Sequence, residues 1–193
     1  MVGMRFVSRS GRVLAGVTAA VLVGAAAASL VPFEIGTALR LVAIVGFATA
    51  GLYAAFWRPS LEVRDDGVVV RNPLADYEIE WGAITRIDTK WGLSLHTVRR
   101  TVSVWAAPAP GRHAALTAAR EQGLHLPEST YLAGTVRPGD LVTSESGGAA
   151  AVVRREWERR HGESGVRVVR HVNVTLVVAL GVLGAAAATA VIL

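Results

Sequence analysis

Residues 60–81 read SLEVRDDGVVVRNPLADYEIEW, and this stretch decides the fold of the segment around it. Aliphatic residues flank Asp65-Asp66-Gly67, a pattern that predicts a β-hairpin whose turn glycine takes a positive φ. Asn72-Pro73 ends the second strand, because proline lacks the N–H that a sheet ladder needs. Tyr77–Trp81 then alternates apolar and charged residues, as a half-buried strand does. The stretch therefore predicts short antiparallel strands with one buried face.

The same alternation continues downstream of this stretch. Gly82 and Ala83 interrupt it, and three further segments resume the period of two: 84–89, 93–98 and 101–105. Together these segments predict about five or six strands in meander order. The tryptophans at strand spacing are expected to pack in the core or on a sheet face: Trp81, Trp91 and Trp105.

The pattern changes at Pro108. Residues 110–148 predict an irregular insertion, with a short helix at 113–123 and a loop at 124–148 that contains Gly147-Gly148. Residues 149–161 predict a C-terminal helix that carries Val153 and Trp157 on one face. We expect Trp157 to close the open end of the sheet.

Three uncharged blocks flank this segment on both sides: 13–31, 41–57 and 172–193. Each is long enough to cross the ~30 Å hydrocarbon core of a bilayer as a helix. The chain is therefore predicted to be an α+β membrane protein in three parts. An N-terminal membrane hairpin occupies 1–57, a compact domain occupies 58–171, and a C-terminal transmembrane helix occupies 172–193.

Basic residues at the ends of the blocks predict the orientation. Arg5, Arg9 and Arg12 precede the first block, and further Arg residues flank the 58–171 segment. Under the positive-inside rule, the N-terminus and the domain face the cytoplasm at the plasma (inner) membrane, and the C-terminus lies outside. The first block also fits a secretory signal with a cleavage site near Ala26-Ala27-Ala28. Both alternatives leave the domain cytoplasmic.

Composition and motifs argue against catalysis. The chain has no cysteine, and its five histidines show no metal-binding spacing: His96, His113, His125, His161 and His171. No nucleophile or phosphate-loop motif occurs. The net charge of +5 belongs largely to the membrane flanks, so a nucleic-acid partner is not expected. We expect no enzyme activity, no catalytic residue, no cofactor, no metal and no small-molecule substrate.

Four basic residues in the strand region are candidates for contact with anionic lipid: Arg86, Lys90, Arg99 and Arg100. The alternative is that they are solvated side chains near a hairpin tip. Small residues four apart, such as Gly16 and Gly24 in the first block and Gly46 in the second, permit close helix packing. An alanine-rich sequence also gives such spacings by chance.

Patterned aliphatic and tryptophan positions resemble a known family. They are Arg58-Pro59, Leu61-Glu62-Val63, Asp66–Pro73, Ile79-x-Trp81-x-x-Ile84-x-x-Ile87, Trp91-Gly92-Leu93, Val102-x-Val104-Trp105-Ala106-Ala107 and Arg154-Arg155-x-Trp157-Glu158. This set resembles the bacterial pleckstrin-homology-like (PH-like) domains of small actinobacterial membrane proteins, in the group that includes low-molecular-weight protein antigen 6. The resemblance implies a strongly bent antiparallel sheet of about seven strands with a C-terminal helix, and no enzymatic activity.

The resemblance and the spans together predict a membrane-anchored interaction or scaffold protein. Its expected partners are the lipid bilayer and another membrane or membrane-associated protein. A sensor of anionic lipid or envelope state, and an accessory subunit of a membrane complex, are the alternatives. Eukaryotic PH domains often bind phosphorylated headgroups through a basic loop between the first two strands. Here that loop is Asp65-Asp66-Gly67, whose negative charge disfavours such a ligand.

Overall fold

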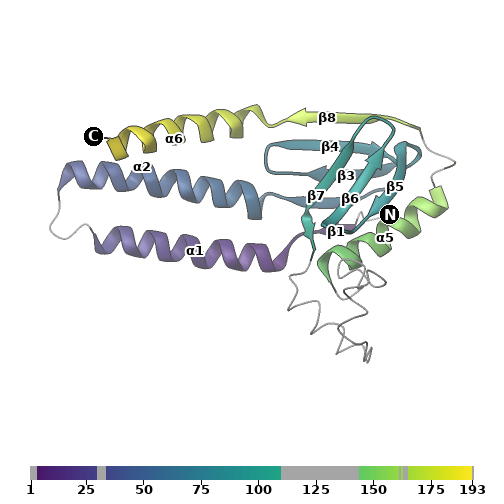
Figure 1. Cartoon of the computed structure of the whole chain (residues 1–193), viewed down its shortest axis with the longest axis horizontal. Coiled ribbons are helices and arrows are strands. Elements are labelled where there is room, and N and C mark those ends of the chain that lie inside the picture. The colour runs from purple at the N-terminus through teal and green to yellow at the C-terminus, as the bar shows by residue number, and fades with distance from the viewer. Residues whose placement is uncertain (1–3, 30–33, 110–143, 161, 163–164, 193) are drawn as a thin grey trace, which may run out of the picture. The chain divides into compact units, whose positions relative to one another are not determined.

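The computed structural model describes residues 4–29, 34–109, 144–160, 162 and 165–192 (Figure 1). The chain divides into two compact units. One unit is a β-rich domain formed by residues 1–8, 59–72 and 76–171, and the other contains three long helices. The expected class, α+β with antiparallel strands, is confirmed for these residues. Most of the expected insertion at 110–148, including the predicted helix at 113–123, lies outside the described residues.

The larger sheet of the domain has five strands in the order β1-β2-β3-β4-β8. They are β1 (Met4–Phe6), β2 (Ser60–Val63), β3 (Gly67–Arg71), β4 (Ala75–Glu80) and β8 (Val168–Val172). The predicted hairpin is confirmed, with Leu61 opposite Val70 in the β2–β3 register. The edge strands β1 and β8 were not predicted, because both are short and lie in basic segments that we interpreted as membrane flanks.

The second sheet contains β5 (Ile84–Asp88), β6 (Gly92–Thr97) and β7 (Thr101–Pro108) in sequence order. A 3-10 turn at Trp81–Ala83 separates it from β4, at the interruption that the sequence showed. The strands therefore form two hydrogen-bonded sheets rather than the one bent sheet that was expected. The Asn72 side chain links them: its Nδ2 donates to Ser103 O at 2.7 Å, and its Oδ1 accepts from Trp105 N at 3.1 Å.

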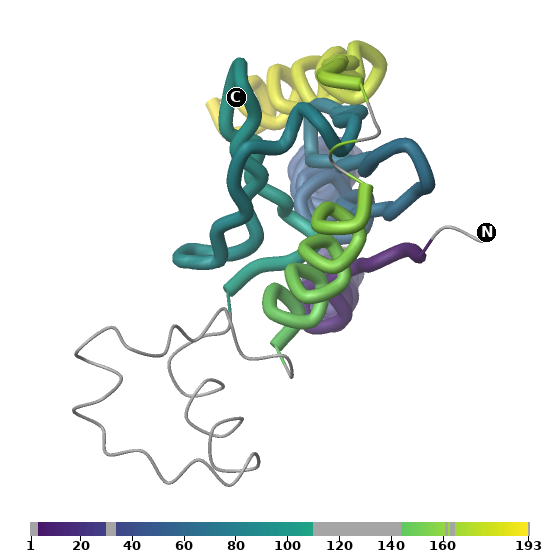
Figure 2. The backbone as a smooth tube through the Cα atoms, turned by 90° about the vertical axis from the view of Figure 1, so that its right-hand side faces the viewer, coloured from purple at the N-terminus to yellow at the C-terminus, as the bar shows by residue number. Residues whose placement is uncertain are grey.

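The core of the domain is built from the inward faces of both sheets. Its largest fully buried side chains include Trp81, Leu61, Ile79 and Leu95. Helix α5 (Glu145–Arg160) packs against the three-stranded sheet, and Figure 2 shows the helix beside these strands. Trp157 is partly buried against the core and donates from Nε1 to Ile84 O at 3.0 Å.

Helix α5 begins four residues before the predicted helix. Ser144 caps it, since its Oγ accepts a hydrogen bond from Gly147 N at 2.9 Å. Gly147, Ala149 and Ala150 are buried, so the small residues at the start of the helix allow it to approach the strands closely. The expectation of a loop around residues 147–148 was wrong for this reason.

Two of the three strand-region tryptophans are not core residues. Trp81 is fully buried as expected, whereas Trp91 is 85% exposed and Trp105 is 53% exposed. Trp91 lies in the turn before β6. Trp105 lies on the outward side of β7, because its neighbours Val104 and Ala106 take the inward positions.

The second unit contains α1 (Arg9–Ala28), α2 (Ile35–Leu52) with a π-helical end at Tyr53–Trp57, and α6 (Val174–Ile192). All three helices are long and apolar enough to cross a membrane. Two of them begin earlier than the uncharged blocks, because a helix can continue through flanking arginines. Arg40 therefore lies within the second turn of α2 and not at its leading edge, as was expected.

Glycines in the helical unit lie at contacts between its own helices. A Cβ on Gly46 would touch Leu183 of α6 at 3.9 Å, and one on Gly184 would press on Phe47 of α2 at 3.2 Å. Gly16 of α1 faces Trp57 at 3.9 Å. Gly24 and Gly181, in contrast, have no neighbour within 4 Å. Part of the small-residue pattern is thus used inside the unit.

Gly67 is required for a close approach and not for a positive φ. Among the described residues, the glycine with positive φ is Gly92, at 114°. A Cβ on Gly67 would overlap the Ile79 carbonyl oxygen and lie 2.8 Å from Glu80 Cα. These are backbone atoms of β4, which cannot move aside without breaking the β3–β4 ladder.

We predict that Gly67→Ala destabilises the domain by ~1–3 kcal/mol, the usual cost of overpacking a filled site. Thermal unfolding of the full-length protein in detergent, followed by tryptophan fluorescence, measures this loss. Gly162→Ala is the control, because a Cβ there meets nothing within 4 Å. Equal melting temperatures for the two variants would contradict the packing explanation.

Candidate functional site

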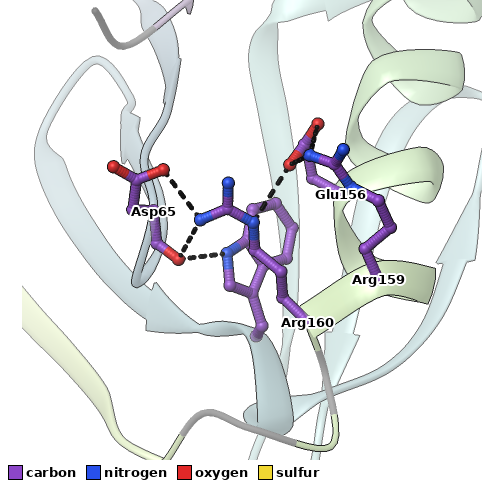
Figure 3. A network of polar contacts seen from close by, with 5 residues as sticks. Asp65, Glu156, Arg159 and Arg160 are labelled. Atoms are coloured by element: carbon purple, nitrogen blue, oxygen red, sulfur yellow. Dashed lines mark hydrogen bonds and ion pairs between the residues drawn. The ribbon is translucent and has the colours of Figure 1, made fainter. Parts of the chain in front are cut away.

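The β2–β3 turn is contacted by a residue from the end of α5. Arg160, the last residue of α5, donates from Nη1 to both the carbonyl oxygen and Oδ1 of Asp65, each at 2.8 Å. Trp81 Nε1 donates to the same carbonyl oxygen at 3.2 Å. Figure 3 shows the Arg160 guanidinium between Asp65 and Glu156. The turn is therefore closed by an internal cation.

Neighbouring acids hold this cation in place. Glu156, one helical turn earlier, accepts from Arg160 Nε at 3.1 Å and from Arg159 Nη2 at 2.7 Å. The hydrogen bond from Arg160 lowers the pKa of the Asp65 carboxyl, and the same bond raises the pKa of the guanidinium. Both groups are thus held in their charged forms, which strengthens the closure.

Beside the turn, β3, β4 and the start of β8 line a shallow groove of mixed charge. Its polar residues are Arg64, Asp66, Glu78, Glu80 and Arg167. The hydrogen bond from Arg64 lowers the pKa of Glu62, which also pairs with Arg71 at 3.1 Å. Glu80 accepts from the backbone N–H of Arg167 at 2.9 Å. Three acids against two cations make this groove a poor site for a phosphate.

The structure does not bring the four candidate lipid-contact residues together. Lys90 lies in the turn between β5 and β6, whereas Arg99 and Arg100 lie in the turn between β6 and β7. These turns are at opposite ends of β6, about 20 Å apart for six residues at 3.3 Å each. A single basic face made of all four residues is therefore not formed.

Arg86 lies between these ends, on the outward face of the three-stranded sheet. Its guanidinium contacts His96 Nε2 at 3.1 Å and Asp88 Oδ2 at 3.7 Å. His96 Nδ1 in turn contacts Thr101 Oγ1 at 2.9 Å. A polar row thus crosses the three strands, and its arginine is partly neutralised by an acid.

The sequence analysis did not predict that Lys90 and an exposed Trp91 side chain lie in contact. The Lys90 ammonium lies 5.7 Å from the centre of the Trp91 ring, within the range of a cation–π interaction. Trp91 and Trp105 are the large exposed side chains at this end of the sheet. The signal available in the sequence was the position of Trp91 immediately before Gly92, where a turn and not a strand interior is expected.

Within the described part of the chain, no group of three or more His, Asp and Glu residues could hold a metal ion. His96 and His171 belong to that part, and the other three histidines lie outside it. His96 serves the polar row, and His171 is exposed in β8.

Comparison with known proteins gives one family match, which covers part of the chain. Residues 58–139 match the bacterial PH domain family. No curated protein and no solved structure matches the chain significantly. The match confirms the expected PH-like character of this segment, and PH domains are generally non-catalytic interaction modules. The narrower resemblance, to the actinobacterial group with low-molecular-weight protein antigen 6, stays a prediction.

We predict that Asp65→Asn reduces the stability of the domain at neutral pH and that this difference disappears in acid. The folded pKa of Asp65 lies below its unfolded value of about 3.9, so its contribution is fully present above that value. It is lost as the pH falls through the lower folded pKa. Melting temperatures of the wild-type and variant proteins, measured from pH 7 down to the acid limit of folding, test this. A difference that stays constant in acid would show that the carboxylate charge does not matter.

Proposed function

We propose that the protein is a membrane-anchored PH-like interaction or scaffold module, without catalytic activity, at the cytoplasmic face of the plasma (inner) membrane. The main support for this proposal is that two strands of the domain are joined to apolar helices by very short links. Only Arg58-Pro59 separates the π-helical end of α2 from β2, and only Asn173 separates β8 from α6. A domain tethered this closely is confined to the membrane surface.

Contacts in the helical unit support the proposed orientation, with the N-terminus inside and the C-terminus outside. Arg12 donates from Nη2 to Trp57 O at 3.1 Å, and its guanidinium lies 5.7 Å from the centre of the Trp57 ring. An arginine and a tryptophan in contact at helix ends are typical of a membrane–water interface. Both residues lie at the ends of α1 and α2 that lead into the domain.

The proposed partner is another membrane or membrane-associated protein. The five-stranded sheet ends in β1 and β8, and an extended peptide can add to such an edge through backbone hydrogen bonds. In β8, Arg170, His171 and Val172 are exposed. The β6–β7 turn offers a second exposed surface, with Val98 63% exposed beside Arg99 and Arg100.

An accessory subunit of a membrane complex is the second candidate. It is favoured by the open space at Gly24 and Gly181, since each could take a close helix from another protein. Gly24→Leu would then abolish co-purification of the partner. Gly46→Leu is unsuitable for this test, because Gly46 already packs against Leu183 within the chain.

We predict that photocrosslinking probes in the domain of the full-length protein, in living cells, capture discrete protein partners. Suitable sites are Arg86 on the outward sheet face and Arg99 in the β6–β7 turn, both exposed. Glu158, exposed on α5, is the matched control site. Mass spectrometry of the adducts identifies the partner.

Adducts that are specific to Arg86 or Arg99 would support the interaction module. Lipid adducts alone, or the same protein adducts at all three sites, would contradict it. The chain has no cysteine, so a single cysteine at Val98 also tests the orientation. A membrane-impermeant maleimide should label it only after the cells are permeabilised, and labelling of intact cells would overturn the cytoplasmic placement.

A further inference from the structure

Two exposed tryptophans lie at one end of the three-stranded sheet. The β6–β7 register pairs Gly92 with Pro108 and Ser94 with Ser103, with a bulge in between. Trp105 belongs to that bulge, opposite Leu93, and Trp91 immediately precedes Gly92. The register therefore places both side chains at the β5–β6 end of the sheet, together with Lys90. We call Lys90, Trp91 and Trp105 the aromatic end.

The turn that carries Trp91 is held by several local contacts. Thr89 is 1% exposed, and Lys90 N donates to Asp88 Oδ1 at 3.0 Å. Gly92 has a φ of 114°, and a Cβ there would lie 3.1 Å from Ala109 N. These contacts hold the backbone of the turn in place. The Trp91 side chain extends from it and is 85% exposed.

Asn72, which contacts β7, is followed directly in the chain by Pro73–Ala75 of the helical unit. Trp105 N donates to Asn72 Oδ1 at 3.1 Å, and Asn72 is followed by Pro73 and Leu74. The Leu74 carbonyl accepts from Asn173 N at 3.0 Å, and Asn173 Oδ1 caps α6 by accepting from Leu176 N at 3.0 Å.

The chemistry of the aromatic end suits the headgroup zone of a bilayer. Tryptophan combines a large apolar ring with an N–H donor and is enriched at membrane–water interfaces. Lys90 carries its charge on a flexible stem and can reach phosphate oxygens while the stem lies along apolar surface. Two exposed tryptophans would be unusual on a face that meets only water.

We propose that the aromatic end lies in the headgroup zone of the same bilayer that the three helices cross. The proposal rests on the membrane anchoring that is part of the proposed function. The occupant of this surface is the bilayer itself, not a specific phosphorylated headgroup, since the β2–β3 turn is closed by Arg160. Lys90 thus remains a lipid contact, whereas Arg99 and Arg100, at the other end of β6, face water.

Single spin labels test the placement directly, because the chain has no cysteine. The full-length protein, with Trp91→Cys or Trp105→Cys, is labelled with a nitroxide and reconstituted into phosphatidylcholine–phosphatidylglycerol vesicles. Each variant keeps the other tryptophan. Val98→Cys is the matched control, since Val98 is an exposed apolar residue in the turn at the opposite end of β6. Collision with molecular oxygen and with a water-soluble nickel chelate is measured by power saturation.

The labels at 91 and 105 should collide several-fold less with the nickel chelate, and more with oxygen, than the label at 98. Equal nickel accessibility at 91, 105 and 98 would overturn the inference. A fourth label at Val182, 64% exposed near the middle of α6, separates this failure from that of the proposed function. A lipid-exposed label at 182 with water-exposed labels at 91 and 105 leaves anchoring intact and removes the proposal. A water-exposed label at 182 overturns the anchoring and the proposal together.

Discussion

The two sheets of the domain depend on the side-chain amide of Asn72. The β3 ladder ends at Arg71, and Pro73 has no N–H with which to extend it. Asn72 supplies one donor and one acceptor in place of a further strand, and both are used on β7, at Ser103 O and Trp105 N. The three-stranded sheet is thereby joined to the strand end of the larger one, and the core that contains Trp81 and Leu95 is enclosed between them. Asn72, which ends β3 together with Pro73, therefore also connects the two sheets.

The closed β2–β3 turn stabilises the domain by linking two segments that are far apart in the sequence. Here the loop contributes an acid, and the cation comes from the end of α5 as Arg160. A charged hydrogen bond of this kind contributes more than a neutral one, because one partner is ionised on each side. The arrangement fastens the C-terminal helix to the first hairpin and leaves no open cationic site there.

The strands could be predicted because a period of two survives in single segments such as Ile84–Asp88, and the PH-like resemblance followed from the same positions. The edge strands β1 and β8 could not, since they lie in basic segments that we interpreted as membrane flanks. The start of α5 was missed because Gly147-Gly148 has the composition of a loop, and only the tertiary contact explains small residues in a helix. The candidate lipid residues were chosen by charge alone. Charge does not reveal that a six-residue strand separates Lys90 from Arg99, nor that Trp91 lies in a turn.

The two ends of β6 carry different side chains, and under the proposed placement they bind different partners. The links at Asn173 and at Arg58-Pro59 are one and two residues long, and proline restricts the backbone of the second. Under the proposed placement, the end that carries Lys90, Trp91 and Trp105 lies at the bilayer. The opposite turn carries Val98, Arg99 and Arg100, about 20 Å further along the strand by its length of six residues. Under the proposed function, a protein partner binds at this second end, because the proposed bilayer contact covers the first.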